Sequence, residues 1–150
     1  MTLNVFRMIE LSGHALSAQR TRMEVASSNL ANAHTTRTPE GGPYRRQDVV
    51  LVSDGIRDNF GSLLDDAMDR GARSVRVSEI RPDPAPPKMV YDPSHPDANA
   101  QGYVAYPNIN SVEEMVNLTT IMRTYQSNIA AFSALQEMAK SAINLGNTTS

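Results

Sequence analysis

Proline and glycine are confined almost entirely to the middle of this chain, and this distribution limits where long helices can form. All nine prolines fall within the stretch from Pro39 to Pro107, together with six of the eight glycines. Both residues are unfavourable inside helices, proline because it lacks an N–H and clashes with the preceding turn, and glycine because of its backbone entropy. The distribution therefore predicts two helical ends and a non-helical centre.

The first segment, from about Leu3 to Ala33, has apolar residues at intervals of seven, as one stripe of a helix would. These residues are Ile9, Leu16, Met23 and Leu30. The companion positions of the heptad are small or polar, namely Ser12, Gln19, Ala26 and Ala33. A seam of small side chains lets helices approach closely but buries little apolar area, so we expect this helix to be unstable alone.

The last segment has a stronger helical pattern, with a capping box at its start and a glycine near its end. Ser111 to Glu114 reads Ser-Val-Glu-Glu, and Gly146 is the predicted C-terminal stop. The expected helix is roughly 50 Å long at a rise of about 1.5 Å per residue. Two rows of residues form its predicted coiled-coil seam, one of Met115, Met122, Ile129, Gln136 and Ile143 and the other of Leu118, Tyr125, Phe132 and Ala139.

A helix of this length needs a second long helix as its partner, and the N-terminal segment is the intrachain candidate. Because both helices join the centre at their inner ends, they should pack antiparallel. The predicted fold is α+β: long N- and C-terminal helices paired as an antiparallel coiled coil, with a small β-rich central region. The expected parts are 1–34, 35–110, 111–146 and a tail at 147–150. Apolar residues off the predicted seam should need cover from other subunits, and these are Leu11, Val25, Val116, Ile121 and Leu135.

Four stretches of the central region are rich in Val and Tyr and are predicted to be strands. They are Tyr44–Val52, Ser74–Ile80, Lys88–Tyr91 and Gly102–Tyr106. Between the first two, Ser53–Arg73 contains five Asp residues and is expected to be an exposed loop, or a short, weak helix around Ser62–Asp69. Pro82, Pro84, Pro86 and Pro87 predict an extended link before the third strand. The pattern leaves open whether the strands form a small open sheet or a twisted hairpin with loops.

Composition excludes several functional classes. The chain has no cysteine, so disulfides, thiolate nucleophiles and cysteine-based metal sites do not arise. Its net charge is −2 with basic residues spread along the chain, which argues against nucleic acid as a partner. The N-terminus lacks the basic region and apolar run of a cleavable signal peptide, and no window approaches the ~18 apolar residues of a membrane span.

The best candidate for a catalytic or metal site is Asp92, His95 and Asp97, which place three ligand-type side chains within six residues. A structural role is the preferred interpretation, because neighbouring prolines hold turns and Asp side chains cap them. His14 and His34 lack a nearby nucleophile and carboxylate pair. We therefore expect no catalytic, metal-binding or cofactor-binding residue and no small-molecule substrate.

Charged doublets and a glycine-rich stretch are also given structural interpretations. Glu40 to Pro43 reads Glu-Gly-Gly-Pro, which is a turn pattern without the spacing of a phosphate-binding loop. Arg45 and Arg46, like Glu113 and Glu114, are expected to be solvated charges. The alternative for these doublets is that they pair across a contact between subunits.

The run that follows the first helix resembles a known family signature. Ser27 to Thr36 reads Ser-Ser-Asn-Leu-Ala-Asn-Ala-His-Thr-Thr, which is similar to the signature of bacterial flagellar axial proteins of the rod and hook. Further motifs narrow the resemblance to the proximal rod (FlgC) family: Arg37–Gln47, Val90–Pro93, His95–Ala98, Gly102–Asn108, Glu113–Val116 and Tyr125–Asn128. The signature positions are Ser28, Asn29, Ala31, Asn32, Thr35, Thr36, Gly41, Gly42, Tyr91, Asp92, Pro93, Tyr106, Pro107 and Asn108.

The resemblance implies a structural subunit of the basal-body rod, the drive shaft that transmits torque for swimming. It implies export by the flagellar type III apparatus without a cleaved signal, a periplasmic location, and a helical assembly with other rod subunits and basal-body proteins. The expected packing positions are Ile9, Leu16, Met23, Leu30, Met115, Leu118, Met122, Tyr125, Ile129, Phe132 and Ile143. The terminal helices are expected to order on assembly, and Leu118→Asp or Phe132→Asp to block it while leaving soluble expression intact.

Two other functional classes fit parts of the sequence. The first is a soluble coiled-coil adaptor or chaperone, in which the helices form a stable hairpin in the monomer and the β region binds a client. The second is a metal-dependent enzyme centred on His95, which tight zinc or iron binding would support.

Overall fold

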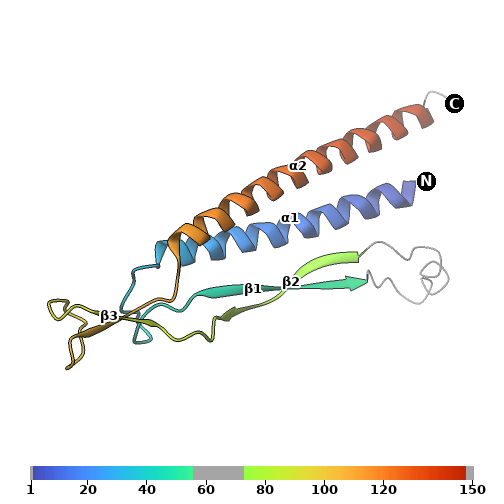
Figure 1. Ribbon diagram of the computed structural model, residues 1–150. Coiled ribbons are helices and arrows are strands. Elements are labelled where there is room, and N and C mark those ends of the chain that lie inside the picture. Colours follow the sequence, from blue (N-terminus) through green and yellow to red (C-terminus); the bar gives the residue numbers. More distant parts are fainter. Residues whose placement is uncertain (1, 56–72, 148–150) are drawn as a thin grey trace. The chain divides into compact units, whose positions relative to one another are not determined.

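The computed structural model describes residues 2–55 and 73–147, and it confirms an α+β fold (Figure 1). The elements in chain order are α1 Thr2–Ala31, β1 Gln47–Gly55, β2 Arg73–Pro82, β3 Lys88–Tyr91, β4 Tyr103–Tyr106 and α2 Ser111–Asn147. The four strands therefore form where they were predicted, with shifts of up to three residues at their ends. The predicted helix at Ser62–Asp69 lies outside the described residues. Within the described parts of the chain, no helix is long and apolar enough to cross a membrane.

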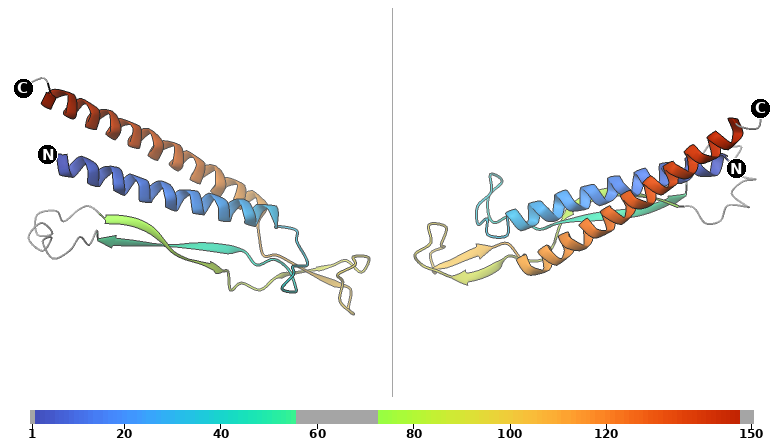
Figure 2. Two further views of the ribbon diagram at one scale, coloured as in Figure 1. Left: turned by 180° about the vertical axis from the view of Figure 1, so that it is seen from behind. Right: turned by 90° about the horizontal axis from the view of Figure 1, so that it is seen from above.

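The chain divides into two compact units, and each contains part of both helices and of the β1–β2 pair. Unit 1 consists of Met1–Arg20, Leu51–Ser78 and Arg123–Ser150, and unit 2 of Thr21–Val50 and Glu79–Met122. Within each unit the α1 and α2 segments run antiparallel, with α1 between α2 and the strands (Figures 1 and 2). The antiparallel pairing of the terminal helices is thus as predicted.

The strands pair as two separate two-stranded sheets, β1 with β2 and β3 with β4. The sequence left open whether the central strands form one small open sheet or a twisted hairpin with loops. The structure has two hairpin-like ribbons and no single sheet among the described strands. The β3–β4 pair is antiparallel, and its register sets Val90 opposite Val104 and Tyr91 opposite Tyr103. Val104 is fully buried, whereas its partner Val90 is exposed.

The start of α2 differs from the predicted capping box. Asn110, not Ser111, caps the helix: its Oδ1 accepts a hydrogen bond from Val112 N at 3.1 Å, and its carbonyl accepts one from Glu114 N at 3.0 Å. The Glu114 carboxylate is directed instead at Arg46. At the other end Gly146 does not stop the helix, because α2 continues to Asn147.

Small residues of α1 and of the turn that follows it provide much of the buried surface of the described residues. Ala18, Ala26 and Ala33 are nearly inaccessible to solvent, as a narrow seam requires. The other buried hydrophobic residues are Val104, Ile109 and Ile121, all in unit 2. Of the described α2 side chains beyond Ile121, none is buried. The core of the chain is therefore concentrated in unit 2.

The intrachain seam of α2 lies one position away from the predicted seam. Buried and half-buried residues alternate at spacings of four and three: Glu114, Leu118, Ile121, Tyr125, Asn128, Phe132, Leu135 and Ala139. Of the predicted rows, Leu118 and Tyr125 are half-buried and Met115 is exposed, whereas Glu114 and Ile121, which lie outside the predicted rows, are buried. The expectation that Ile121 needs another subunit's cover is wrong, since it is only 2% exposed. The apolar pattern did not reveal this seam, because two of its positions are occupied by polar residues, Glu114 and Asn128.

Candidate functional site

The signature residue Asn29 fastens α1 to the start of β1. Its side chain is 1% exposed. Asn29 Nδ2 donates to the Gln47 carbonyl at 2.9 Å, and Asn29 Oδ1 accepts from Gln47 N at 2.8 Å. The Tyr44 hydroxyl donates to the same Oδ1 at 3.1 Å. The asparagine therefore pairs with the backbone of β1 as a neighbouring strand would, and it satisfies its own buried amide in doing so.

The rest of the signature ends the helix and turns the chain. Asn32 N and Asn32 Nδ2 both donate to the Ser28 carbonyl, at 3.0 and 2.9 Å. The Thr35 hydroxyl donates to Asn32 Oδ1 at 3.1 Å. Thr36 Oγ1 then donates to Asp97 Oδ2 at 2.8 Å, across 61 residues of sequence. These signature residues therefore have structural roles, which the resemblance did not specify.

An ion-pair cluster centred on Arg46 joins the start of β1 to the start of α2. Arg46 Nε donates to Glu114 Oε1 at 2.6 Å, and Arg46 Nη1 donates to Asp48. A second carboxylate oxygen, Asp83 Oδ2, lies 3.8 Å from Nη1. Glu114 is 4% exposed, so its charge depends on this partner. Arg46 and Glu114 therefore pair with each other within the chain. Both expectations from the sequence, solvated charges or pairs between subunits, are wrong for these two residues.

The environment of Arg46 changes its acidity in opposing ways. Partial burial lowers the pKa of Arg46, but the hydrogen bond and negative charge of Glu114, followed by those of Asp48, outweigh it and raise the pKa. The guanidinium therefore keeps its charge at neutral pH, and the cluster links the start of β1 to the start of α2.

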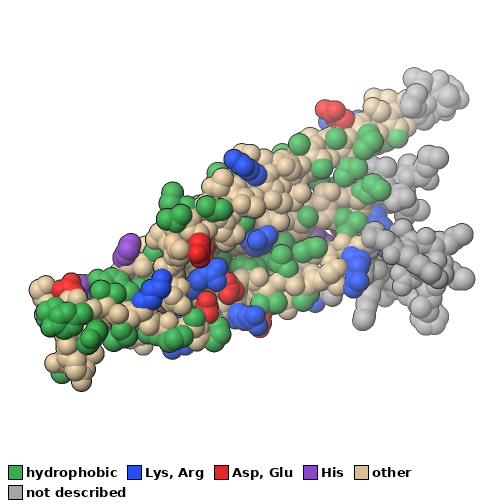
Figure 3. All heavy atoms as spheres, viewed as in Figure 1, with side chains coloured by type: hydrophobic (Ala, Val, Ile, Leu, Met, Phe, Trp, Pro, Cys, Tyr) green, Lys and Arg blue, Asp and Glu red, His purple; other side chains and the backbone are tan. Residues whose placement is uncertain are grey.

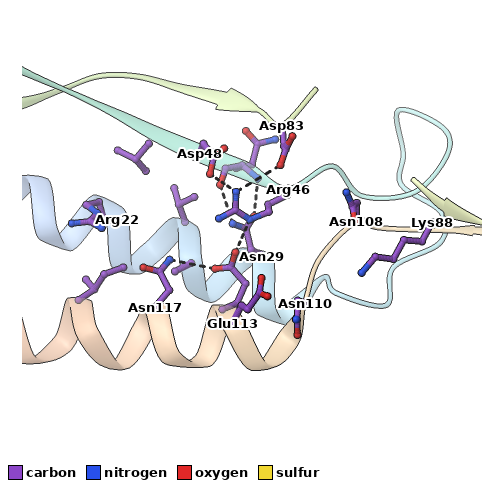
Figure 4. A pocket seen from close by; sticks show the side chains of 16 residues that line it. Arg22, Asn29, Arg46, Asp48, Asp83, Lys88, Asn108, Asn110, Glu113 and Asn117 are labelled. Atoms are coloured by element: carbon purple, nitrogen blue, oxygen red, sulfur yellow. Dashed lines mark hydrogen bonds and ion pairs between the residues drawn. The ribbon is translucent and has the colours of Figure 1, made fainter. Parts of the chain in front are cut away.

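A polar cavity of about 730 Å³ lies beside this cluster in unit 2 (Figure 4). Its lining mixes charges of both signs with amides, and includes Arg22, Arg46, Lys88, Asp48, Asp83, Glu113, Glu114 and Asn117. Ile121 and Ala26 contribute apolar surface from α2 and α1. Because acidic and basic groups neutralise one another here, the arrangement suits a stabilising junction better than a site for a charged substrate.

The metal candidates Asp92, His95 and Asp97 are engaged in turn structure. Asp92 Oδ1 accepts from Ser94 Oγ at 2.7 Å, and His95 Nδ1 accepts from Asp97 N at 3.1 Å. The hydrogen bond from Ser94, partly opposed by desolvation, lowers the pKa of Asp92. In the described part of the chain, no three ligand-type side chains are grouped to hold a metal ion.

The predicted packing residues fall into half-buried and exposed sets. Those of α1, Ile9, Leu16, Met23 and Leu30, are half-buried, as are Leu118, Tyr125 and Phe132 of α2. In contrast, Met115, Met122, Ile129 and Ile143 are 42–56% exposed. We call these four residues the exposed row of α2. The row flanks the intrachain seam, and Figure 3 shows apolar side chains at the surface along this helix.

Asn29→Ala is expected to lower the free energy of unfolding by about 2–3 kcal/mol, because it leaves the Gln47 backbone and the Tyr44 hydroxyl without their buried partner. Urea unfolding followed by circular dichroism would measure the change. Ser27→Ala, at an exposed position of the same helical turn, is the matched control and should shift stability by less than about 0.5 kcal/mol. Equal stability of both variants would contradict the role given to Asn29.

Comparison with known proteins agrees with this architecture. Residues 9–37 match the model of the flagella basal body rod protein family, and residues 100–145 match that of the flagellar basal body rod FlgEFG protein C-terminal region. The chain is 42% identical to the flagellar basal-body rod protein FlgC of Bacillus subtilis, covering 96% of this chain and 99% of the relative. It is 38% identical to FlgC of Salmonella typhimurium, covering 96% and 97%. With family signatures at both ends and relatives matched over nearly their full length, the chain belongs to the FlgC family of flagellar basal-body rod proteins.

Proposed function

We propose that this chain builds the proximal part of the flagellar rod by packing the exposed row of α2 against helices of neighbouring subunits. Membership of the FlgC family makes the chain a structural rod subunit of the basal body and not an enzyme. The observation that carries the packing proposal is the exposed row itself, whose members lie seven, seven and fourteen residues apart, with Gln136 at the intervening heptad position. Such a repeat is the pattern by which helices pack along their length.

Burial of the exposed row would contribute substantially to assembly. A fully buried Met or Ile side chain is worth about 1.5–3 kcal/mol relative to an exposed one. Val112, Val116 and Met138 add further apolar surface on α2 and are 56–69% exposed. An assembled helix can therefore gain several kilocalories per mole, which offsets part of the entropy lost when the helix ends become ordered.

The junction of unit 2 has a mechanical part in this proposal. Asn29 joins the inner end of α1 to the start of β1, and the Arg46–Glu114 pair joins the inner end of α2 to the same region. Force on either helix is therefore transmitted to the start of β1 through these hydrogen bonds and ion pairs. Subunits related by a repeating rotation and rise form a helical assembly through unlike surfaces. Its partners are other rod subunits and basal-body proteins. The periplasmic location, and export through the flagellar type III apparatus without a cleaved signal, belong to the same proposal.

Hydrogen exchange on the purified monomer should separate this role from that of a preformed coiled-coil adaptor. Amides of 21–31 and 111–122 should exchange slowly, because buried Asn29, Glu114 and Ile121 lie there. Amides of 123–144 should exchange at least about a hundredfold faster, since no described side chain in that range is buried. Equally strong protection along the whole of α2 would favour a stable monomeric hairpin.

Deletion of the gene and complementation would test the function itself. Cells without this chain should not swim, and their basal bodies should lack a rod and hook. Expression of the intact chain should restore both. Normal basal bodies in the deletion strain would overturn the proposed role.

A further inference from the structure

The end of β2 and the link to β3, both in unit 2, present prolines to solvent on a backbone that is held by hydrogen bonds. Pro82, Pro84 and Pro86 are exposed, whereas the alternate residues Asp83 and Ala85 are half-buried. Asp83 N donates to the Arg46 carbonyl at 2.7 Å, and Ala85 N donates to Asp83 Oδ1 at 2.8 Å. Proline fixes φ and restricts the residue before it, so this segment is extended before it meets any partner.

The β3–β4 hairpin presents two tyrosines on one face. Tyr91 and Tyr103 are cross-strand partners, are 65% and 43% exposed, and have ring centroids 5.3 Å apart. Met89 lies on the same face and is also exposed. Gly102 has a φ of +80°, and a Cβ there would stand 2.9 Å from the Tyr91 ring. The ring thus packs on backbone that only glycine can provide, and a ring held in place loses little entropy on binding.

We propose that the Tyr91–Tyr103 face of one copy binds the exposed proline segment of a second copy of this chain. Aromatic surfaces bind extended segments with Pro-x-x-Pro spacing, and Pro84 and Pro87 have that spacing. Both surfaces lie in unit 2, and Figure 3 shows apolar side chains gathered at the surface over the hairpin. The contact uses none of the exposed row of α2, so it is a second interface beyond the helix packing proposed above.

Charge and geometry favour a second copy as the occupant. Exposed Arg81 lies three residues before Pro84, and the half-buried Asp92 carboxylate directly follows Tyr91, so a basic group stands beside one surface and an acidic group beside the other. One copy cannot satisfy both, because β3 is held straight by its pairing with β4 between Pro87 and Tyr91. The two surfaces are different, so a pair of copies joined by one contact still has one free tyrosine face and one free proline segment. The contact can therefore repeat from subunit to subunit.

Photo-crosslinking of the full chain would test this contact. A benzoylphenylalanine placed at Met89 keeps both tyrosines, and mixing isotope-labelled with unlabelled chains distinguishes adducts between copies from those within one. After irradiation at high protein concentration, adducts between copies should map to residues 81–88. Tyr91→Ala, or Pro84→Ser with Pro87→Ser, should lower their yield about tenfold, whereas Tyr91→Phe should keep it.

A variant of the exposed row separates this contact from helix packing. Met115→Asp should leave the yield of adducts at 81–88 unchanged, even if it prevents rod assembly. Adducts confined to one copy, adducts that map to α2 or to another basal-body protein, or no adduct at all would overturn the contact between copies. An unchanged yield in the proline double variant, with its fold intact by circular dichroism, would overturn it as well.

Discussion

Replacing Arg46 with methionine is expected to lower the free energy of unfolding by roughly 3 kcal/mol. The substitution keeps most of the aliphatic bulk but leaves Glu114, 4% exposed, without the guanidinium that donates to it at 2.6 Å. Desolvation of an unpaired carboxylate outweighs the small gain from the new apolar side chain. Chemical denaturation would show the loss as a lower midpoint.

Two further variants isolate the ion pair as the cause. Arg46→Met combined with Glu114→Met should recover most of the lost stability, because both charges leave together. Arg45→Met, at the exposed neighbour, should cost less than about 0.5 kcal/mol. If the Arg46 variant unfolds at the same midpoint as the parent chain, the cluster does not stabilise the junction.

The Arg46–Glu114 ion pair could not be predicted from the sequence, because its two residues are far apart along the chain. Arg46 and Glu114 are 68 residues apart, and each stands in a doublet of like charges that is typical of a solvated surface. Helical periodicity and proline placement are local signals, so they located both helices and the four strands within residues 2–55 and 73–147. They did not show which side chains meet when the elements pack.

The seam of α2 shows the same limit within a single helix. Choosing the most apolar rows placed Met115 and Met122 in the intrachain seam, whereas Glu114 and Ile121 occupy it. Glu114 can lie there only because Arg46 arrives from another element. Asn29 is a similar case, since a polar residue inside a helix is usually exposed but here pairs with the Gln47 backbone. The family resemblance marked Asn29 as important without giving its partner.

Met122→Asp and Ile129→Asp, together or singly, are expected to abolish swimming while leaving the stability of the monomer within about 0.5 kcal/mol. Both side chains are exposed in the chain, 45% and 42%, so a carboxylate there stays hydrated until assembly. Packing against a neighbouring helix would then bury an unpaired charge, which costs several kilocalories per mole. Motility in soft agar and electron microscopy of basal bodies would measure the effect.

The control for these variants carries the same charge on another side of the helix. Ser127→Asp is exposed and lies away from the exposed row, so cells that carry it should retain swimming better than cells with Met122→Asp. Leu118→Asp and Phe132→Asp, suggested by the sequence, are less informative tests, because both side chains are half-buried within the chain. They should destabilise the monomer as well as the assembly. Normal rods with Met122→Asp would contradict packing through this row.

Methionine oxidation tests the central claim most directly, because it compares the same side chains in the free chain and in the rod. Met115, Met122 and Met89 are all exposed in the chain, so dilute peroxide should oxidise all three quickly in the monomer. In purified basal bodies, Met115 and Met122 should be protected at least about tenfold if the exposed row packs against neighbouring helices. Oxidation of Met115 and Met122 at the monomer rate in intact basal bodies would show that the row faces solvent and that subunits join elsewhere.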